Sequence, residues 1–596
     1  MSLLPADLKA FATGVADPTA LVTLKTSQLR KHALLLRAIM DAARRNFPDE
    51  YVTSGYETSY DLLASVQATD TAQVTFVLAH PQVGSWAHAC FRLFLEPAVD
   101  REQVRTALGQ LGCVAAAAAI RASLGFEVTV PVQQGAVLLP TLGQAVFGAD
   151  GVAVIRHDER GLALTSGTTT VVPPADHRED GPGWLGLRRI TAESAGIRLE
   201  LDLDDLGPHR ACGTRAVSPR LSEDAFKHWR DQVREAWTLL VSVAPDGAAC
   251  VAQVLASLVP QAEGYSESTT SRDAYGAVQL TEPSYNAYLA ETLVHESQHS
   301  ILNAVLDLCP LYEDGGGLYY SPPRDDPRPL HGLLHATYAF FGIADFWRRH
   351  RHACDDRSPE YAQFQFASGR AQVLRSTGSL LESGSLTAEG EAFVAGMRAT
   401  AQEWAAEEVA DLPLAWAEAA ALDHQIVWRL NNLRHDPGDV AALAKAWIDA
   451  ERVPLPISDL KPVVVPLADA APKHIRSQLR YLRLLSPESF ERVCSGLEPI
   501  PNTTAGVDNA DLAYLRGDHT TAARLYAEHI AGGADEATDW AGLALALREC
   551  GEDADLLVTE PQLVRAVYNA VSDLQEHRPN PRALAHWLRS EVNNVP

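Results

Sequence analysis

The residues best suited to chemistry are His295, Glu296 and His299, which form an HExxH motif within AYLAETLVHESQHSILNAVLDL. Side chains four residues apart on an α-helix lie one above the other, so both histidines can present a ring nitrogen to one metal ion. Leu302 and Leu306 continue the same helical face, which predicts that the histidines lie on a buried apolar stripe. Buried imidazoles need polar partners, and the alternative interpretation is a pair of structural core histidines.

A metal ion held by two histidines needs at least one more protein ligand. The segment RDDPRPLHGLLHATYAFFGIADFWRRH predicts a second helix that begins near Pro329 and carries His331 and His335, again four residues apart. We favour His335 as the third ligand, with His331 as the alternative. The histidine that is not a ligand is expected to lie in the core or to support a ligand.

The loop between these two predicted helices is rich in Gly and Pro and contains Arg324 and Arg328. A guanidinium group is a natural partner for a carboxylate of a substrate or cosubstrate. Either arginine can instead pair with Asp325 or Asp326, and the sequence leaves both interpretations open.

A polar segment, SESTTSRDAYG, precedes the HExxH helix. Its side chains can line the pocket of the motif, or they can belong only to a hydroxyl-rich turn. The candidate pocket residues are Ser268, Thr270 and Arg272.

Two enzyme classes use such a motif in different ways. In a zinc peptidase, Glu296 would be the general base that activates a metal-bound water. In a non-haem iron oxygenase, the same helix supplies part of a ligand set that leaves positions open for oxygen and a ketoacid. The HExxHxxGxxH continuation of one peptidase group is missing, because Leu302 and Val305 stand where it requires Gly and the third His. The sequence therefore fits the common peptidases poorly.

The elements that must position these residues are mostly helical. Apolar spacing predicts an α+β protein that is predominantly α-helical, with a β-rich segment near 128–203 and a helical metal-binding core. One stretch, LAYLRGDHTTAARLYAEHIAGGADEATDWAGLALALREC, predicts a C-terminal helical hairpin that is similar to a tetratricopeptide (TPR) unit. The predicted regions are a mainly helical one at 1–127, a β-rich one at 128–205, the HExxH core at 206–355, a helical one at 356–460 and a TPR-like module at 461–596.

Charge and composition limit the classes of partner. The chain has 50 Lys and Arg against 76 Asp and Glu, a net charge of −26, which argues against nucleic acid as a partner. No apolar run is long enough for a membrane span, and the N-terminus lacks the features of a signal peptide, so we expect a cytoplasmic protein. The eight cysteines form no CxxC pair and are expected to be free thiols. Nothing indicates an oligomeric state.

Four stretches together resemble one protein family. The chain is similar to the HEXXH-motif peptide-modification proteins of actinobacterial natural-product clusters, some of which are regarded as iron- and 2-oxoglutarate-dependent peptide β-hydroxylases. The resemblance covers about 74–351, and the part from His295 to His335 is the most specific. The stretches that carry it are VTFVLAHPQVGSWAHACF, SESTTSRDAYGAV, LAETLVHESQHSILNAVLDL and RDDPRPLHGLLHATYAFFGIADFWRRH.

The resemblance implies an activity and a role for each residue. His295 and His299 would bind Fe(II) with His335, and Glu296 would handle protons or support the ligands. Arg328, and less surely Arg324, would bind a carboxylate of 2-oxoglutarate. The expected reaction is hydroxylation of a side-chain β carbon in a ribosomally made precursor peptide. The alternatives are a Zn²⁺ metallopeptidase and a non-catalytic, peptide-binding helical scaffold.

Overall fold

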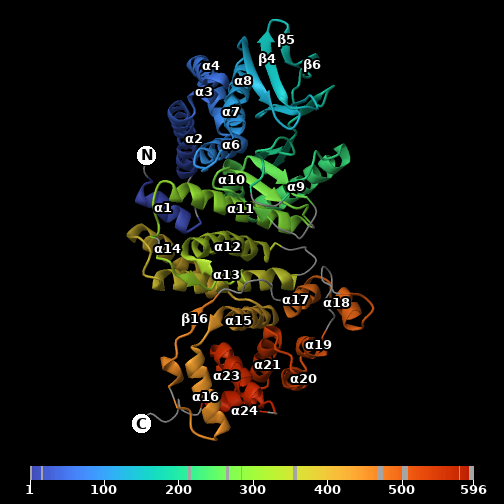
Figure 1. The fold of residues 1–596 in the computed structure, drawn as a ribbon. Helices are drawn as coiled ribbons and strands as arrows, with labels where there is room; N and C mark the ends of the chain where they lie inside the picture. The colour runs from blue at the N-terminus through green and yellow to red at the C-terminus, as the bar shows by residue number, and fades with distance from the viewer. Residues whose placement is uncertain are drawn as a thin grey trace. The chain divides into compact units, whose positions relative to one another are not determined.

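The computed structural model divides the chain into two compact units, Met1–Leu311 and Tyr312–Pro596, and each is described by itself. Figure 1 draws the chain from blue at the N-terminus to red at the C-terminus. The structure describes residues 3–14, 18–212, 216–262, 268–283, 285–313, 315–353, 359–454, 456–465, 474–499, 508–575 and 577–589. The predicted free thiol of Cys354 lies outside these residues. The described residues include six free cysteines, Cys90, Cys113, Cys212, Cys250, Cys494 and Cys550.

The first unit begins with a series of helices (Figure 1). The most deeply placed is α8, which is buried from Leu111 to Ile120 because it consists almost wholly of small and apolar residues. Its small side chains let a strand approach closely, since a Cβ atom at Gly112 would lie 2.7 Å from Cγ1 of Val130. These helices are α1 (Pro5–Ala12), α2 (Pro18–Asn46), α3 (Pro48–Thr53), α4 (Tyr56–Thr69), α5 (Thr71–Leu78), α6 (Pro81–Leu93), α7 (Arg101–Gly109) and α8 (Leu111–Arg121).

Two antiparallel sheets follow these helices. The four-stranded sheet has the order β1-β4-β5-β6, and the three-stranded sheet has the order β2-β3-β7. Strand β1 alternates between exposed and buried positions, as expected for a sheet that covers a core with one face. The strands are β1 (Phe126–Val132), β2 (Ala136–Leu139), β3 (Gly143–Val146), β4 (Gly151–Asp158), β5 (Gly161–Ser166), β6 (Thr169–Val171) and β7 (Trp184–Gly186).

A five-stranded mixed sheet, in the order β11-β12-β10-β9-β8, supports the HExxH helix. Its central strand β10 is parallel to β9 and β12 and buried at every residue. Helix α9 packs against β8, and α10 packs against β9. Helix α11 packs against α9, α10 and α2. The elements are β8 (Arg189–Ser194), β9 (Ile197–Leu203), α9 (Glu223–Val243), α10 (Pro245–Val254), β10 (Ser257–Pro260), β11 (Ser268–Thr269), β12 (Ala277–Leu280) and α11 (Asn286–Leu306).

The second unit starts with a short hairpin, β13 (Leu318–Tyr319) and β14 (Arg328–Pro329), and is otherwise mostly helical. Helix α13 packs against α12, α14 and α15, and α20 packs against α21. The remaining elements are α12 (Leu330–His350), α13 (Pro359–Glu382), α14 (Ala388–Ala405), α15 (Asp411–Asn432), β15 (Leu433–Arg434), α16 (Pro437–Ile448), a 3-10 turn (Ile457–Asp459), β16 (Val463–Val464), α17 (Ile475–Leu485), α18 (Pro487–Cys494), α19 (Asn509–Leu515), α20 (His519–Gly532), α21 (Ala537–Glu549), α22 (Asp555–Thr559), α23 (Pro561–Leu574) and α24 (Pro581–Arg589).

The predicted coarse class, a mostly helical α+β protein, is confirmed. Strands β1 to β9 run from Phe126 to Leu203, the part of the chain for which a β-rich segment was predicted. The predicted core at 206–355 contains α11 of the first unit and α12 of the second unit. Among the helices that the structure describes, none is both long and apolar enough to cross a membrane.

Candidate metal centre

Helix α11 brings the two histidines of the HExxH motif together. The Nε2 atoms of His295 and His299 are 3.1 Å apart, and their ring planes are almost perpendicular, at 85°. Two nitrogens bound to one ion at about 2.0–2.1 Å each lie about 3 Å apart, so the pair has the spacing of two ligands of one cation. The same distance also suits a hydrogen bond between two neutral imidazoles, which is the arrangement without a metal.

Partial burial favours the neutral form of both imidazoles. Loss of solvent lowers the pKa of His295 to about 4. Loss of solvent, and then the proximity of His295, lowers the pKa of His299 to about 4. A neutral imidazole is the form that binds a metal ion, so these two side chains fit a transition-metal cation. On the helical face that was predicted to be buried, Leu302 is fully buried, whereas His295, His299 and Leu306 are only partly buried.

Glu296 lies beside the histidine pair and is almost fully buried, with 1% of the residue exposed. Its Oε1 atom is 3.9 Å from Nε2 of His295. Its Oε2 atom accepts a hydrogen bond from the hydroxyl of Thr270, which follows β11 directly. The short strand β11 thus places a donor that fixes the orientation of this carboxylate.

The other two candidate pocket residues lie near Thr270. Ser268 belongs to β11 and is paired with Leu280 of β12. Arg272 binds Asp307, the residue that follows the last turn of α11, with 3.1 Å between Nε and Oδ1. Of the three predicted pocket residues, Thr270 contacts the HExxH motif through its hydrogen bond to Glu296.

The two candidates for a third ligand lie on α12 of the second unit. His331 is exposed, and its ring stacks against Tyr312 with 6.4 Å between centroids. His335, one turn further along the helix, is partly buried. The choice of His335 over His331 stays a prediction.

Both arginines of the preceding loop pair with the same carboxylate. Nε of Arg324 is 3.1 Å from Oδ1 of Asp326, and Nη1 of Arg328 is 2.9 Å from Oδ2. Burial alone would raise the pKa of Asp326, but the two guanidinium groups hold that pKa below its usual range. Both arginines therefore pair with an aspartate, and that aspartate is Asp326. Asp325 instead lies next to His424 and His474. Binding of a cosubstrate carboxylate by either arginine stays a prediction.

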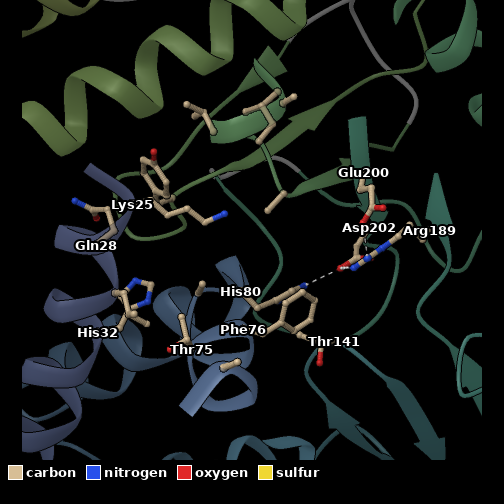
Figure 2. A pocket seen from close by; sticks show the side chains of 18 of the residues that line it. Lys25, Gln28, His32, Thr75, Phe76, His80, Thr141, Arg189, Glu200 and Asp202 are labelled. Atoms are coloured by element: carbon tan, nitrogen blue, oxygen red, sulfur yellow. Dashed lines mark hydrogen bonds and ion pairs between the residues drawn. The ribbon is translucent and has the colours of Figure 1, made fainter. Parts of the chain in front are cut away.

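The first unit also contains a cavity of about 580 Å³ that the sequence did not indicate (Figure 2). Three of its buried polar atoms, Nε2 of His80, Oγ1 of Thr141 and Oη of Tyr275, have no hydrogen-bond partner within the described residues. At one end, Asp202 Oδ2 lies 3.7 Å from His80 Nε2, and Asp202 Oδ1 accepts a hydrogen bond of 2.8 Å from Nε of Arg189. These residues come from segments far apart in the chain, so no local spacing could have predicted the cavity.

No protein-family model matches the chain, and a search of curated proteins finds no significant match.

Proposed function

We propose that the protein is a non-haem Fe(II)- and 2-oxoglutarate-dependent oxygenase that hydroxylates a side-chain β carbon of a ribosomally made precursor peptide. The observation that supports a metal most directly is the 3.1 Å spacing of the Nε2 atoms of His295 and His299. The choice of iron and 2-oxoglutarate comes from the resemblance of the four sequence stretches. His335 is proposed as the third ligand.

The neutral imidazoles of His295 and His299 would hold the metal ion from one side of α11. Bound iron and 2-oxoglutarate would supply the capacity to activate O₂ for attack on an unactivated C–H bond. The buried Glu296 carboxylate, which Thr270 holds in place, can accept a proton beside the metal or orient a water there.

The proposed roles of the second unit are to bind the cosubstrate and the peptide. Arg328 presents a planar fork that fits a carboxylate, and Asp326 occupies this fork in the structure. A ketoacid would therefore have to compete with Asp326. Helices α20 and α21 pack against each other. We propose that they are a TPR-like hairpin and that this C-terminal region binds the peptide.

One observation favours a second candidate, a zinc metallopeptidase. Oε1 of Glu296 is 3.9 Å from Nε2 of His295, so the carboxylate is near enough to a shared metal to act on a metal-bound water. The two candidates differ in their products, because an oxygenase consumes 2-oxoglutarate and leaves the peptide chain intact.

The experiment combines metal-free protein with Fe(II), ascorbate, 2-oxoglutarate and the precursor peptide encoded beside its gene. We expect a peptide heavier by one oxygen atom, together with succinate. His299→Ala should abolish both products and retain the folded circular dichroism spectrum. His228→Ala, at an exposed histidine of α9 that pairs with Glu282, is the matched control and should retain activity.

Two other results would contradict the proposal. Zinc-dependent cleavage of the peptide without succinate would identify a peptidase. Loss of folding in His299→Ala, with no product from the wild type, would indicate a structural metal in a peptide-binding scaffold.

A further inference from the structure

The second unit brings Asp325, His424 and His474 together from three separate segments. Asp325 lies in the loop of the β13–β14 hairpin, His424 lies on α15, and His474 directly precedes α17. Nε2 of His474 is 2.7 Å from Oδ1 of Asp325, and Nε2 of His424 is 3.4 Å from the same oxygen. The three potential ligand atoms all lie within 4.8 Å of one another.

Neighbouring groups contact the side chain of His424 and the backbone of Asp325. The hydroxyl of Tyr320 is 2.9 Å from Nδ1 of His424, so this contact engages the ring nitrogen that faces away from Asp325. Nδ2 of Asn432 donates a hydrogen bond of 2.9 Å to the backbone carbonyl of Asp325. Partners of this kind fix the ring orientation of metal-binding histidines in general.

The cluster is partly buried and remains open to solvent. The exposed fractions of the side chains are 35% for Asp325, 19% for His424 and 28% for His474. Asp423, which precedes His424, is engaged elsewhere, because Nη2 and Nε of Arg476 lie 2.7 and 2.9 Å from its two carboxylate oxygens. Among the described residues, the cluster therefore consists of one carboxylate and two imidazoles, each partly exposed to solvent.

We propose that Asp325, His424 and His474 form a second divalent-metal site, separate from the HExxH motif and able to bind Zn²⁺ or a similar transition-metal ion. Two imidazoles and one carboxylate are a donor set that binds such ions and leaves further positions for water or an anionic ligand. This proposal does not depend on the hydroxylase function, because none of the three residues belongs to the HExxH motif.

A metal-free explanation of the same contacts is a hydrogen-bonded His–Asp–His cluster. In that case, burial would lower the pKa of His474, but the neighbouring Asp325 raises this pKa above its usual value. The two explanations differ in one measurable property, the binding of a metal ion.

The test is a titration of the metal-free, full-length protein with Zn²⁺ by isothermal calorimetry, in a His299→Ala background that disables the HExxH pair. We expect about one Zn²⁺ to bind per chain in this background. Adding Asp325→Asn or His424→Ala should abolish this binding. The matched controls are Asp326→Asn, at the adjacent carboxylate that pairs with arginines, and His586→Ala, at a histidine whose side chain is 79% exposed. Both controls should retain the bound ion.

The outcomes that would overturn the proposed site can be separated from poor folding of a variant. Asp325→Asn preserves the shape of the side chain and its acceptor oxygen, and circular dichroism reports whether each variant is folded. Absence of Zn²⁺ binding in folded His299→Ala would overturn the proposal, as would unchanged binding in folded His299→Ala/Asp325→Asn. If the wild type and His299→Ala bind the same number of Zn²⁺ ions per chain, the HExxH motif does not bind Zn²⁺. This result would leave the proposed site at Asp325, His424 and His474 standing.

Discussion

The hydroxyl of Thr270 donates a hydrogen bond to Oε2 of Glu296, so the short segment after β11 holds the carboxylate that lies beside the histidine pair. Glu296 is almost fully buried, so this hydrogen bond helps to fix the position of its carboxylate. The relationship makes Thr270 a positioning residue for the candidate metal centre.

Removing this hydroxyl should destabilise the protein. Thr270→Val preserves the shape of the side chain but leaves a buried carboxylate oxygen without its donor, which costs about 1–3 kcal/mol of unfolding free energy. Thr270→Ser retains the donor and should cost clearly less. Urea unfolding followed by circular dichroism measures both variants. Equal stability of the Val variant and the wild type would show that the hydrogen bond contributes little.

Asp307, the residue that follows α11, should make a pH-dependent contribution to the free energy of unfolding. Asp307 accepts hydrogen bonds from Lys31 at 2.8 Å and from Gln28 at 3.0 Å, and it also binds Arg272. Burial alone would raise the pKa of Asp307, but these donors hold it below its usual value. The folded state therefore binds this proton more weakly than the unfolded chain does, so the contribution is complete at neutral pH and is lost as the pH falls through the folded pKa.

The variant that tests this contribution is Asp307→Asn. It should lower the unfolding free energy at neutral pH by about 1–3 kcal/mol. The loss should shrink as the pH falls below about 4, where the carboxylate of the unfolded wild-type chain begins to bind a proton, and it should vanish below the lower folded pKa. The measurement is a series of urea unfolding curves between neutral and acidic pH. A difference between variant and wild type that does not change with pH would contradict the assignment.

Two buried tyrosines, Tyr275, which lines the cavity of Figure 2, and Tyr56, which does not, should respond differently to loss of the hydroxyl group. The hydroxyl of Tyr275 has no hydrogen-bond partner among the described residues, whereas that of Tyr56 donates to the carbonyl of Leu36 at 2.8 Å. Tyr275→Phe should leave the unfolding free energy unchanged or raise it, and Tyr56→Phe should lower it by about 1 kcal/mol. Equal losses in the two variants, measured by urea unfolding, would show that a water or ligand satisfies Tyr275.

The sequence could predict those parts of the fold that depend on local spacing. The four-residue spacing of His295 and His299 predicted that their rings would lie on one helical face, and α11 places their Nε2 atoms 3.1 Å apart. The amino-acid composition of a short segment is a less reliable guide to its secondary structure, because a residue before the segment can cap a helix. The stretch TAQVTFVL is rich in β-branched residues but forms α5, because Asp70 accepts hydrogen bonds from the first backbone amides of that helix.

Residues that meet only through tertiary packing could not be predicted from the sequence. His474 lies 149 positions from Asp325, and nothing in the spacing of either residue indicates that they meet at 2.7 Å. From the sequence, Asp325 is a possible partner for Arg324 or Arg328, but in the structure both arginines bind Asp326. Adjacent carboxylates with different partners can be told apart only when the packing around each is known.

The most direct test of the proposed oxygenase is the source of the oxygen atom added to the peptide. The reaction is run with Fe(II) and 2-oxoglutarate under ¹⁸O₂ in ordinary water, and the peptide is analysed by mass spectrometry. The account predicts an intact peptide that carries one ¹⁸O atom when wild-type protein is present and none when His299→Ala replaces it. A cleaved peptide whose new carboxylate takes its oxygen from water would contradict the account and identify a hydrolase.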